Sequence, residues 1–258
     1  MINLSRNNLF NFEKKIILIT GSSGQLGTSF SKLFLSQKAI VIGMDKIESK
    51  LKNKNFYHFK LDVSNRKKVE KSISKIILKF KKIDVIINNA GISVFSKFYK
   101  RKDKEINDTI NSNLKGSLNL INAYLNLHTK KKLKKCNIIN VGSIYGSLSP
   151  DFRIYGKNDN FNSEIYGASK AAIIQLTKYF CVALAKHNIN VNCISPGGIL
   201  NEKKPQKKSF LKKYSLRVPK NRIGKVSDLY TALLFLASEH SDYVNGQNLI
   251  IDGGLSAW

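Results

Sequence analysis

The chain has 258 residues, 42% of them hydrophobic, and a formal net charge of +27. This length suits one large α/β domain, residues 1–258, with a buried core, and it is short for two domains. Its longest apolar runs fall well below the ~18 residues that a membrane-spanning helix needs, and its first residues lack the apolar stretch of a secretory signal. The composition therefore argues against both a membrane protein and an exported one.

The positive charge comes mainly from lysine, and the few arginines do not cluster. Recognition of base edges and bidentate recognition of phosphates depend on arginine. Because Lys, Asn and Ile are the residues that an AT-rich genome favours, we attribute the charge to genome composition and expect no nucleic-acid partner. The alternative, an anionic partner, stays open for two lysine-rich segments, Lys130–Lys135 and Lys203–Lys213.

The three cysteines, Cys136, Cys181 and Cys193, are scattered along the chain. Their spacing does not match a metal-ligand motif, so no metal site is expected. An odd number of cysteines without a disulfide framework is typical of a reducing compartment. We therefore expect a cytoplasmic protein.

Short apolar runs rich in Ile and Val alternate with longer segments of helical length. The runs lack strict polar alternation, as do strands buried on both faces of a parallel sheet. The alternation predicts right-handed βαβ crossovers and a Rossmann-type doubly wound parallel sheet of about seven strands, with helices on both faces. The expected strands are Ile16–Thr20, Ala39–Gly43, Phe56–Leu61, Asp84–Asn88, Asn137–Val141, Ile189–Ile194 and Asn248–Ile251; the expected helices are Gln25–Gln37, Arg66–Phe80, Asp103–Leu127, Tyr166–His187 and Lys225–Ser238.

A glycine-rich loop, Thr20–Gly27, lies between the first expected strand and the first expected helix. Glycines permit a tight turn and a close backbone approach, and the helix N-terminus then offers free N–H groups to a pyrophosphate. This position in the chain predicts a dinucleotide site. The residues expected to contact the cofactor here are Gly21, Ser23, Gly24, Gln25, Leu26 and Gly27.

The second expected strand leads into Asp45. A carboxylate at this place accepts hydrogen bonds from the ribose hydroxyls of NAD and repels the 2′-phosphate of NADP. We therefore expect NAD, although Lys46 beside it keeps NADP open. Asp62 and Val63, just after the third strand, are expected to hold the edge of the adenine ring.

Seven motifs in this order resemble those of the short-chain dehydrogenase/reductase family, and the resemblance covers nearly the whole chain. They are Thr20–Gly27, Asn88–Gly91, Asn113, Ser143, the Tyr-x-x-x-Lys motif Tyr166–Lys170, Pro196-Gly197 and Asp252–Gly254. The resemblance implies further cofactor contacts from Asn89, Ala90, Gly91, Tyr166, Lys170, Pro196, Gly197 and Ile199. It also implies a catalytic set of Asn113, Ser143, Tyr166 and Lys170.

The chemistry of alcohol oxidation explains these residue types. A proton must move at oxygen while a hydride moves at carbon, and the ordinary pKa of tyrosine, about 10, is too high for easy exchange near neutrality. Lys170 follows Tyr166 by one helical turn, and its charge is expected to lower the pKa of that tyrosine. By resemblance, Lys170 also binds the nicotinamide ribose, Ser143 orients the substrate oxygen, and Asn113 holds a water in a proton relay.

Three features depart from the family pattern. The glycine loop is spaced Gly-x-x-Gly-x-x-Gly, as in the longer epimerase branch, but Asn88–Gly91 and the short C-terminus match the shorter branch. The threonine that members of the family usually carry near the position of Asn201 is absent from this chain. Tyr155 stands nearer the customary spacing from Ser143 than Tyr166 does; it has Asp159 four positions later where a lysine is needed, so we prefer Tyr166.

The choice of Tyr166 makes Ser149–Glu164 an insertion beside the catalytic centre. The insertion and its flanks, Asn137–Tyr145 and Asn190–Leu200, resemble bacterial oxidoreductases of flagellin and surface-sugar modification, which are associated with acidic nine-carbon sugars. The resemblance implies a sugar, sugar-phosphate or nucleotide-sugar substrate. Basic residues that could hold such a substrate are Arg153, Lys157 and those in Lys203–Lys213.

The sequence therefore predicts an NAD(H)-dependent oxidoreductase that interconverts a secondary alcohol and a ketone, on a small molecule of surface-glycan or flagellin-glycan biosynthesis. One alternative is a 3-oxoacyl-carrier-protein reductase, and another is a non-catalytic, cofactor-binding regulatory protein. By resemblance, a homodimer or homotetramer is expected through the helices Asp103–Leu127 and Tyr166–His187. The substrate, the direction of the reaction and its stereochemistry stay open.

Overall fold

A computed structural model describes residues 10–155 and 161–258. Its centre is a seven-stranded parallel sheet in the order β3-β2-β1-β4-β5-β6-β7. This architecture confirms the predicted doubly wound sheet. The strands are β1 (Ile16–Thr20), β2 (Ile40–Asp45), β3 (Phe56–Lys60), β4 (Val85–Asn88), β5 (Cys136–Val141), β6 (Ile189–Pro196) and β7 (Asn248–Ile251).

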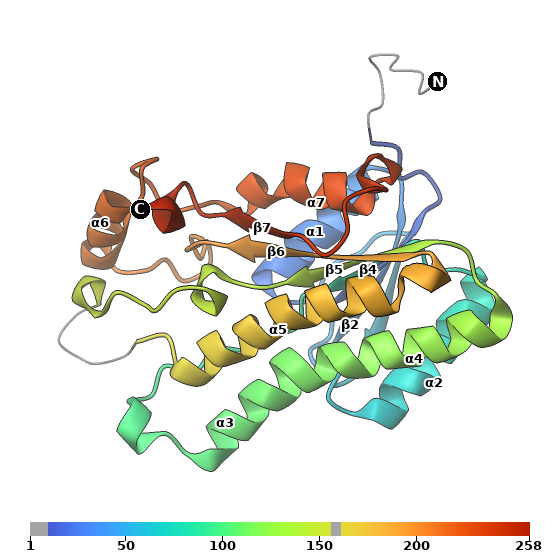
Figure 1. The fold of residues 1–258 in the computed structure, drawn as a ribbon, viewed down its shortest axis with the longest axis horizontal. Helices are drawn as coiled ribbons and strands as arrows, with labels where there is room; N and C mark the ends of the chain where they lie inside the picture. The colour runs from blue at the N-terminus through green and yellow to red at the C-terminus, as the bar shows by residue number, and fades with distance from the viewer. Residues whose placement is uncertain (1–9, 156–160) are drawn as a thin grey trace.

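Helices cover both faces of the sheet (Figure 1). On one face lie α2 (Arg66–Phe80), α4 (Gly116–Lys131) and α5 (Glu164–Ala183), and on the other lie α1 (Gln25–Ser36) and α7 (Tyr230–Ala237). Successive side chains of a strand point to opposite faces. Accordingly, Ile16 and Leu18 of β1 join the core under α2 and α4, whereas Ile17 and Ile19 join the core under α1 and α7. No helix in the described ranges has both the length and the apolar character to cross a membrane.

The strand order reverses between β1 and β4, which are neighbours in the sheet with Ile17 paired to Val85. The chain runs outward from β1 to β3 on one side and from β4 to β7 on the other. The carboxyl ends of β1 and β4 therefore border the crevice at which doubly wound folds bind their ligands. The glycine-rich loop after β1 opens into this crevice.

The expected helix Asp103–Leu127 is interrupted in the structure. It consists of α3 (Asp103–Ile110), a π-helical turn at Asn111–Lys115, and α4. A π-helical turn contains an extra residue and often marks a functional position. This one contains Asn113, and the apolar periodicity of the segment gave no indication of it.

The helix expected at Tyr166–His187 is α5, which begins two residues earlier at Glu164. Ser163 caps it, because its hydroxyl accepts a hydrogen bond from the Tyr166 N–H at 3.2 Å. The cap holds the first turn of α5, which carries Tyr166, beside the end of β5. The helix expected at Lys225–Ser238 divides into a 3-10 turn, Val226–Leu229, and α7.

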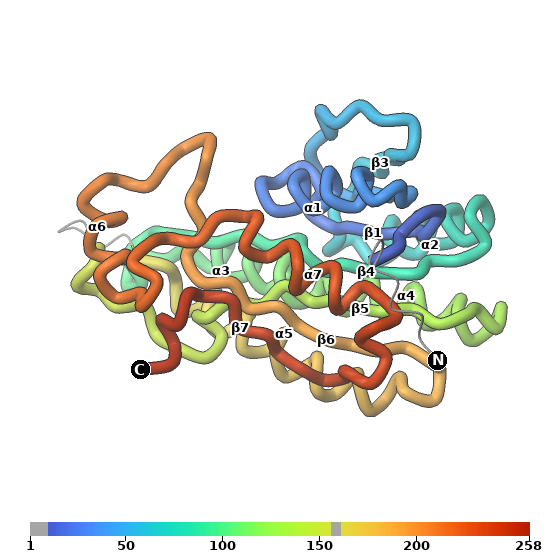
Figure 2. The backbone as a smooth tube through the Cα atoms, turned by 90° about the horizontal axis from the view of Figure 1, so that it is seen from above, coloured from blue at the N-terminus to red at the C-terminus, as the bar shows by residue number. Residues whose placement is uncertain are grey.

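Helix α6 (Lys208–Arg217) was not predicted from the sequence. It is rich in lysine, and its few apolar residues give no clear amphipathic pattern. Its Phe210 and Tyr214 pack into a small separate core together with Ile144 after β5, Ile154 of the insertion, Val218 after α6 and Leu255 near the C-terminus. This helix lies beyond the carboxyl ends of the strands (Figure 2), where it closes one side of the candidate site.

Candidate active site

Two glycines of the loop after β1 are required by close contacts. Gly21 has a φ of +64°, and a Cβ there would lie 2.9 Å from the Cα of Ala90. A Cβ on Gly27 would lie 2.1 Å from the carbonyl oxygen of Gly21. Any side chain at either position would therefore push the loop away from β4 or from α1.

Thr20, which the sequence analysis did not single out, fastens the ends of β1 and β4 together. Its hydroxyl accepts hydrogen bonds from the N–H groups of Asn89 and Ala90, both at 3.0 Å. The Asn89 amide donates in return to the carbonyl oxygen of Thr20 at 2.9 Å. These bonds hold the Asn88–Gly91 motif against the glycine loop.

A groove of about 440 Å³ runs along the start of α1. The N-cap of this helix is Gly24, which has no side chain to bond the free N–H groups of the first turn. Such an uncapped end suits a pyrophosphate, so the groove fits the expected dinucleotide. The predicted cofactor residues that line it are Gly21, Ser23, Gly24, Gln25, Leu26, Gly27, Asp45, Val63, Asn89, Ala90 and Gly91.

At the adenosine end of the groove, the Asp45 carboxylate accepts hydrogen bonds from the N–H of Ser23 at 2.9 Å and the N–H of Ile47 at 3.0 Å. Each oxygen keeps a second lone pair for a ribose hydroxyl. Lys46 forms an ion pair with Asp62 at 2.9 Å. Asp62 orients Lys46 and is absent from the wall of the groove, so its expected contact with the adenine stays a prediction.

A second cavity of about 290 Å³ continues the groove toward the catalytic residues. The two share Leu26, Asn89, Gly91 and Ile92 in their walls. Apart from Asp62 and Asn113, which line neither cavity, the remaining predicted residues line this second cavity: Ser143, Tyr166, Lys170, Pro196, Gly197 and Ile199. The structure thus brings the residues predicted for the nicotinamide half of the cofactor to one place.

Ser143 lies directly after β5, and its hydroxyl accepts a hydrogen bond from the N–H of Tyr145 at 3.1 Å. The hydroxyl proton of Ser143 is therefore available to donate to another oxygen. Burial raises the pKa of Tyr166, and a hydrogen bond with Ser143 opposes that rise. The two hydroxyl groups are thus neighbours, as the catalytic assignment requires.

Lys170 is buried beneath Tyr166. Its ammonium nitrogen donates to the carbonyl oxygen of Val141 at 2.6 Å and lies 5.7 Å from the centre of the Tyr166 ring. Burial lowers the pKa of Lys170 to about 8. The pKa of Tyr166 is raised by burial, and the contact that opposes the rise comes from Ser143, so the expected lowering of this pKa by Lys170 stays a prediction.

Asn113 links the π-helical turn to the loop after β4. Its side-chain oxygen accepts from the N–H of Ile92 at 2.7 Å, and its amide nitrogen donates to the carbonyl oxygen of Ile92 at 3.0 Å and to the Ser169 hydroxyl at 3.0 Å. These bonds hold three segments of the site in position. The water relay that the resemblance implies for Asn113 stays a prediction.

Tyr155, the rival to Tyr166, lies in the wall of the cavity in front of Ser143. Its hydroxyl is 3.1 Å from the hydroxyl of Tyr145, and its ring packs against Phe161 and Phe210. Burial raises the pKa of Tyr155. The described neighbours of its hydroxyl include no ammonium group, so the geometry favours Tyr166 as the proton carrier.

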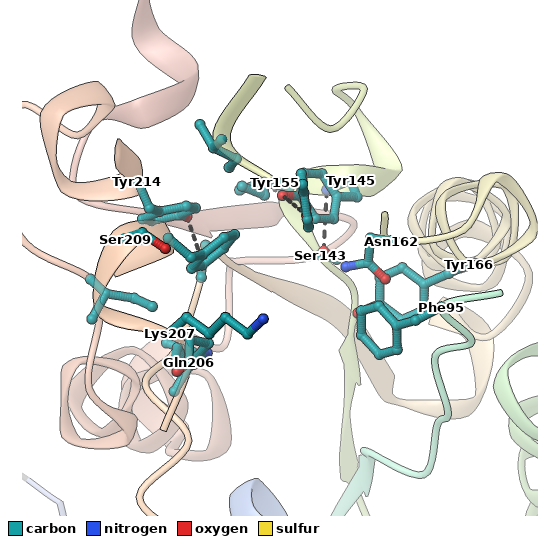
Figure 3. A pocket seen from close by; sticks show the side chains of 17 residues that line it. Phe95, Ser143, Tyr145, Tyr155, Asn162, Tyr166, Gln206, Lys207, Ser209 and Tyr214 are labelled. Carbon is teal, nitrogen blue, oxygen red and sulfur yellow. Dashed lines mark hydrogen bonds between the residues drawn. The ribbon is translucent and has the colours of Figure 1, made fainter. Parts of the chain in front are cut away.

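A third cavity, of about 630 Å³, lies in front of Ser143 and Tyr166, which it shares with the nicotinamide cavity (Figure 3). Its walls come from the end of β5, the insertion, and the segment leading into α6. Several wall residues were not named individually from the sequence because no motif marks them, although some lie in the insertion, its flank or Lys203–Lys213: Phe95, Tyr145, Asn162, Gln206, Ser209 and Tyr214. This cavity is the candidate substrate site.

Ion pairs connect the insertion to α6. Asp151 forms ion pairs with Arg153 at 2.9 Å and with Arg217, at the end of α6, at 3.1 Å. These contacts lower the pKa of Asp151 to about 2, chiefly through the hydrogen bond from Arg153. Arg153, proposed above to hold a substrate, is therefore occupied by Asp151; Lys157 and Asp159 lie outside the described residues.

No cluster of histidine, cysteine and carboxylate side chains that could hold a metal ion occurs within residues 10–155 and 161–258. All three cysteines are free thiols.

Comparisons with known proteins show the family to which the chain belongs. Residues 35–256 match a protein-family model described as enoyl-(acyl carrier protein) reductase. The 3-oxoacyl-[acyl-carrier-protein] reductase FabG of Thermotoga maritima is 35% identical over 256 residues, which cover 94% of this chain and 98% of that protein. The chain therefore belongs to the short-chain dehydrogenase/reductase family and is an oxidoreductase of that type, as predicted.

Two solved structures are also similar. A short-chain dehydrogenase from Leptospira borgpetersenii with bound NAD+ is 40% identical, with a TM-score of 0.89, and the match covers 95% of this chain and 94% of that one. A gluconate 5-dehydrogenase from Burkholderia cenocepacia, in complex with NADP and tartrate, is 26% identical, with a TM-score of 0.84 and coverage of 96% and 98%. Both span nearly the whole chain, including the candidate site.

Proposed function

We propose that this protein interconverts a secondary alcohol and a ketone with a nicotinamide dinucleotide, and that Tyr166 carries the proton. The observation that supports the proposal best is the position of Ser143 and Tyr166 in the shared wall of two cavities, one suited to the nicotinamide and the other to the substrate. The dinucleotide, when bound, supplies or accepts the hydride. The experiment that tests the proposal is turnover by Tyr166→Phe, described in the Discussion.

The proton transfer follows from the hydrogen bonds around Ser143. Because its oxygen already accepts from Tyr145, the Ser143 hydroxyl donates to the substrate oxygen and holds it beside Tyr166. During reduction, the Tyr166 hydroxyl gives its proton to that oxygen, and during oxidation it takes the proton back. Lys170 stabilises the phenolate formed during reduction, since only one of its three N–H donors is used by Val141.

The cofactor that we propose is NAD. The solved relatives do not decide this point, because one structure holds NAD+ and the other NADP. The support comes from the adenosine end of the groove, where the Asp45 carboxylate would repel a 2′-phosphate. Lys46, the nearest cation in the wall, is paired with Asp62 and is thereby less available to bind that phosphate.

Two substrate classes are supported by different observations. The name of the Thermotoga relative favours a 3-oxoacyl thioester over the sugar derivative that the insertion suggested, and it does not support a role in carbohydrate biosynthesis. The hydroxyl and amide groups in the wall of the substrate cavity favour a polar substrate instead. Turnover of acetoacetyl-CoA, compared with a panel of sugar phosphates and nucleotide sugars by nicotinamide absorbance, distinguishes the two classes.

We also propose a homodimer or homotetramer in the cytoplasm. Helix α5 carries the exposed side chains Tyr179 and Val182, which are 64% and 77% accessible and lie one turn apart. Apolar side chains at this spacing form a face that a second copy could bury. The face lies on α5, one of the two helices through which the family resemblance implies association.

A further inference from the structure

The wall of the substrate cavity contains one charged side chain, that of Lys207, among the residues that the structure describes. Figure 3 shows its ammonium group extending into the cavity from the side opposite Tyr166 and Phe95. No carboxylate of residues 10–155 or 161–258 lines the cavity or pairs with this ammonium. Lys207 is an exposed side chain, and a cation directed into a cavity whose described wall carries no counter-charge is complemented by an anion on the ligand.

Three other basic residues near this site are already engaged. Arg153 and Arg217 share the carboxylate of Asp151, at 2.9 and 3.1 Å. The Lys213 ammonium donates to the carbonyl oxygen of Arg153 at 3.1 Å. Among the basic residues of this region that the structure describes, Lys207 is therefore the one that is both directed into the cavity and unpaired.

The backbone on both sides of Lys207 is anchored. The side chain of Gln206 donates to the carbonyl oxygen of Ile199 at 2.9 Å and accepts from the N–H of Asn201 at 3.1 Å. On the other side, Tyr214 of α6 accepts a hydrogen bond from the N–H of Gly198 at 2.5 Å. These bonds hold the segment that carries Lys207 across the cavity from Ser143.

Polar groups on the remaining wall suit a ligand with several hydroxyl groups. The Asn162 side-chain oxygen accepts from the Ser93 hydroxyl, and its amide nitrogen faces the cavity in Figure 3. The hydroxyls of Tyr145 and Tyr155 form a pair 3.1 Å apart beside Ser143. Each of these groups can donate to or accept from a ligand hydroxyl.

We propose that the substrate is a small polyhydroxylated molecule with a carboxylate or phosphate group, and that Lys207 binds this group. The inference rests on the proposed function, because it takes Ser143 and Tyr166 to hold the reacting oxygen in the same cavity. An acyl thioester fits it poorly: its nearest phosphate is separated from the thioester carbonyl by the whole pantetheine arm. Lys207 thus selects the substrate without taking part in the proton transfer.

Calorimetric titration of the cofactor-bound protein tests this role: the sugar probes are titrated with NADH bound and acetoacetyl-CoA with NAD+ bound, so that no probe can be turned over. The probes are gluconate for the carboxylate, glucose 6-phosphate for the phosphate, glucose as the uncharged counterpart, and acetoacetyl-CoA for the thioester. Wild type is expected to bind at least one anion more tightly than glucose. Lys207→Met, which keeps the length of the side chain, should weaken that binding about 10- to 100-fold. Lys207→Arg should retain it, as should the control Lys212→Gln, which changes an exposed lysine of α6 outside the cavity.

Equal binding by Lys207→Met and wild type, equal affinity for glucose and both anions, or no binding of either anion would overturn the proposal. A weakening by Lys207→Met that is confined to acetoacetyl-CoA would overturn it as well. These titrations measure binding without turnover. Failure of the proposed function, seen as undiminished turnover by Tyr166→Phe, is therefore a separate result.

Discussion

The ammonium nitrogen of Lys170 lies 5.7 Å from the centre of the Tyr166 ring and donates to the carbonyl oxygen of Val141 at 2.6 Å. The distance between Lys170 and Tyr166 follows from helical geometry, since the two residues are one turn apart on α5. The hydrogen bond to Val141 depends on the sheet, because Val141 is the last residue of β5 and stands two positions before Ser143. Lys170 thereby connects Tyr166, the proposed proton carrier, to the strand that leads into Ser143.

Tyr166→Phe is expected to lower kcat about 10³-fold or more, because the ring keeps its packing but loses the proton that moves. The dissociation constant for NADH should stay within about twofold of wild type, as measured by fluorescence titration. Tyr155→Phe is the matched control and should retain proton transfer. If Tyr166→Phe turned over normally while Tyr155→Phe did not, the two tyrosines would have been assigned in the wrong order.

The buried Lys170 should make stability depend on pH. Its pKa is about 8 in the folded chain and close to 10.5 when unfolded, so between these values the unfolded state binds more protons. The free energy of unfolding therefore rises with pH in this window and falls again as pH drops toward 8. Relative to that of Lys170→Met, the free energy of unfolding of wild type should rise by about 2 kcal/mol between pH 8 and 9.5.

Urea unfolding of wild type and Lys170→Met at several pH values measures this difference, and other titrating groups cancel because both proteins contain them. A constant difference between the two proteins across the window would show that Lys170 keeps its ordinary pKa in the folded chain.

Asp45 should determine the choice of cofactor. Replacing it with alanine removes the carboxylate that faces the adenosine end of the groove. We expect the dissociation constant for NADH to rise about tenfold and that for NADPH to fall. The ratio of the two constants, measured by titration, is the decisive quantity, because loosening of the Ser23 loop would weaken both cofactors together. Tighter binding of NADPH by wild type would refute the assignment of NAD.

Val182→Asp should disrupt association of the chain if α5 forms the interface. The substitution places a charge at a 77% exposed position, where it costs little in a monomer but would be buried and unpaired between two copies. We expect association at least about tenfold weaker, measured by sedimentation velocity across a dilution series. Leu78→Asp on α2, a similarly exposed apolar residue, is the control and should leave the assembly unchanged. An unaltered oligomer in Val182→Asp would exclude this face.

Much of the site followed from local sequence patterns. The glycine loop was predictable because it stands between a buried strand and an amphipathic helix, and its contacts with Ala90 confirm that side chains are excluded there. Tyr166 and Lys170 were predictable as a pair because helical periodicity alone places them together. The π-helical turn at Asn113 could not be predicted, because its extra residue only shifts the phase of the helical periodicity and the segments on either side still have the pattern of a helix.

By itself, the sequence determined the doubly wound sheet and predicted a place for the dinucleotide and the choice of Tyr166 over Tyr155, because each depends on residues close together in the chain. Only the tertiary structure decided the walls of the substrate cavity. Its residues come from segments as distant as Phe95 and Tyr214, and α6 is held mainly by packing against the insertion and by the Asp151–Arg217 ion pair. The direction of Lys207 into that cavity depends on the same long-range contacts, which no periodicity along the chain records.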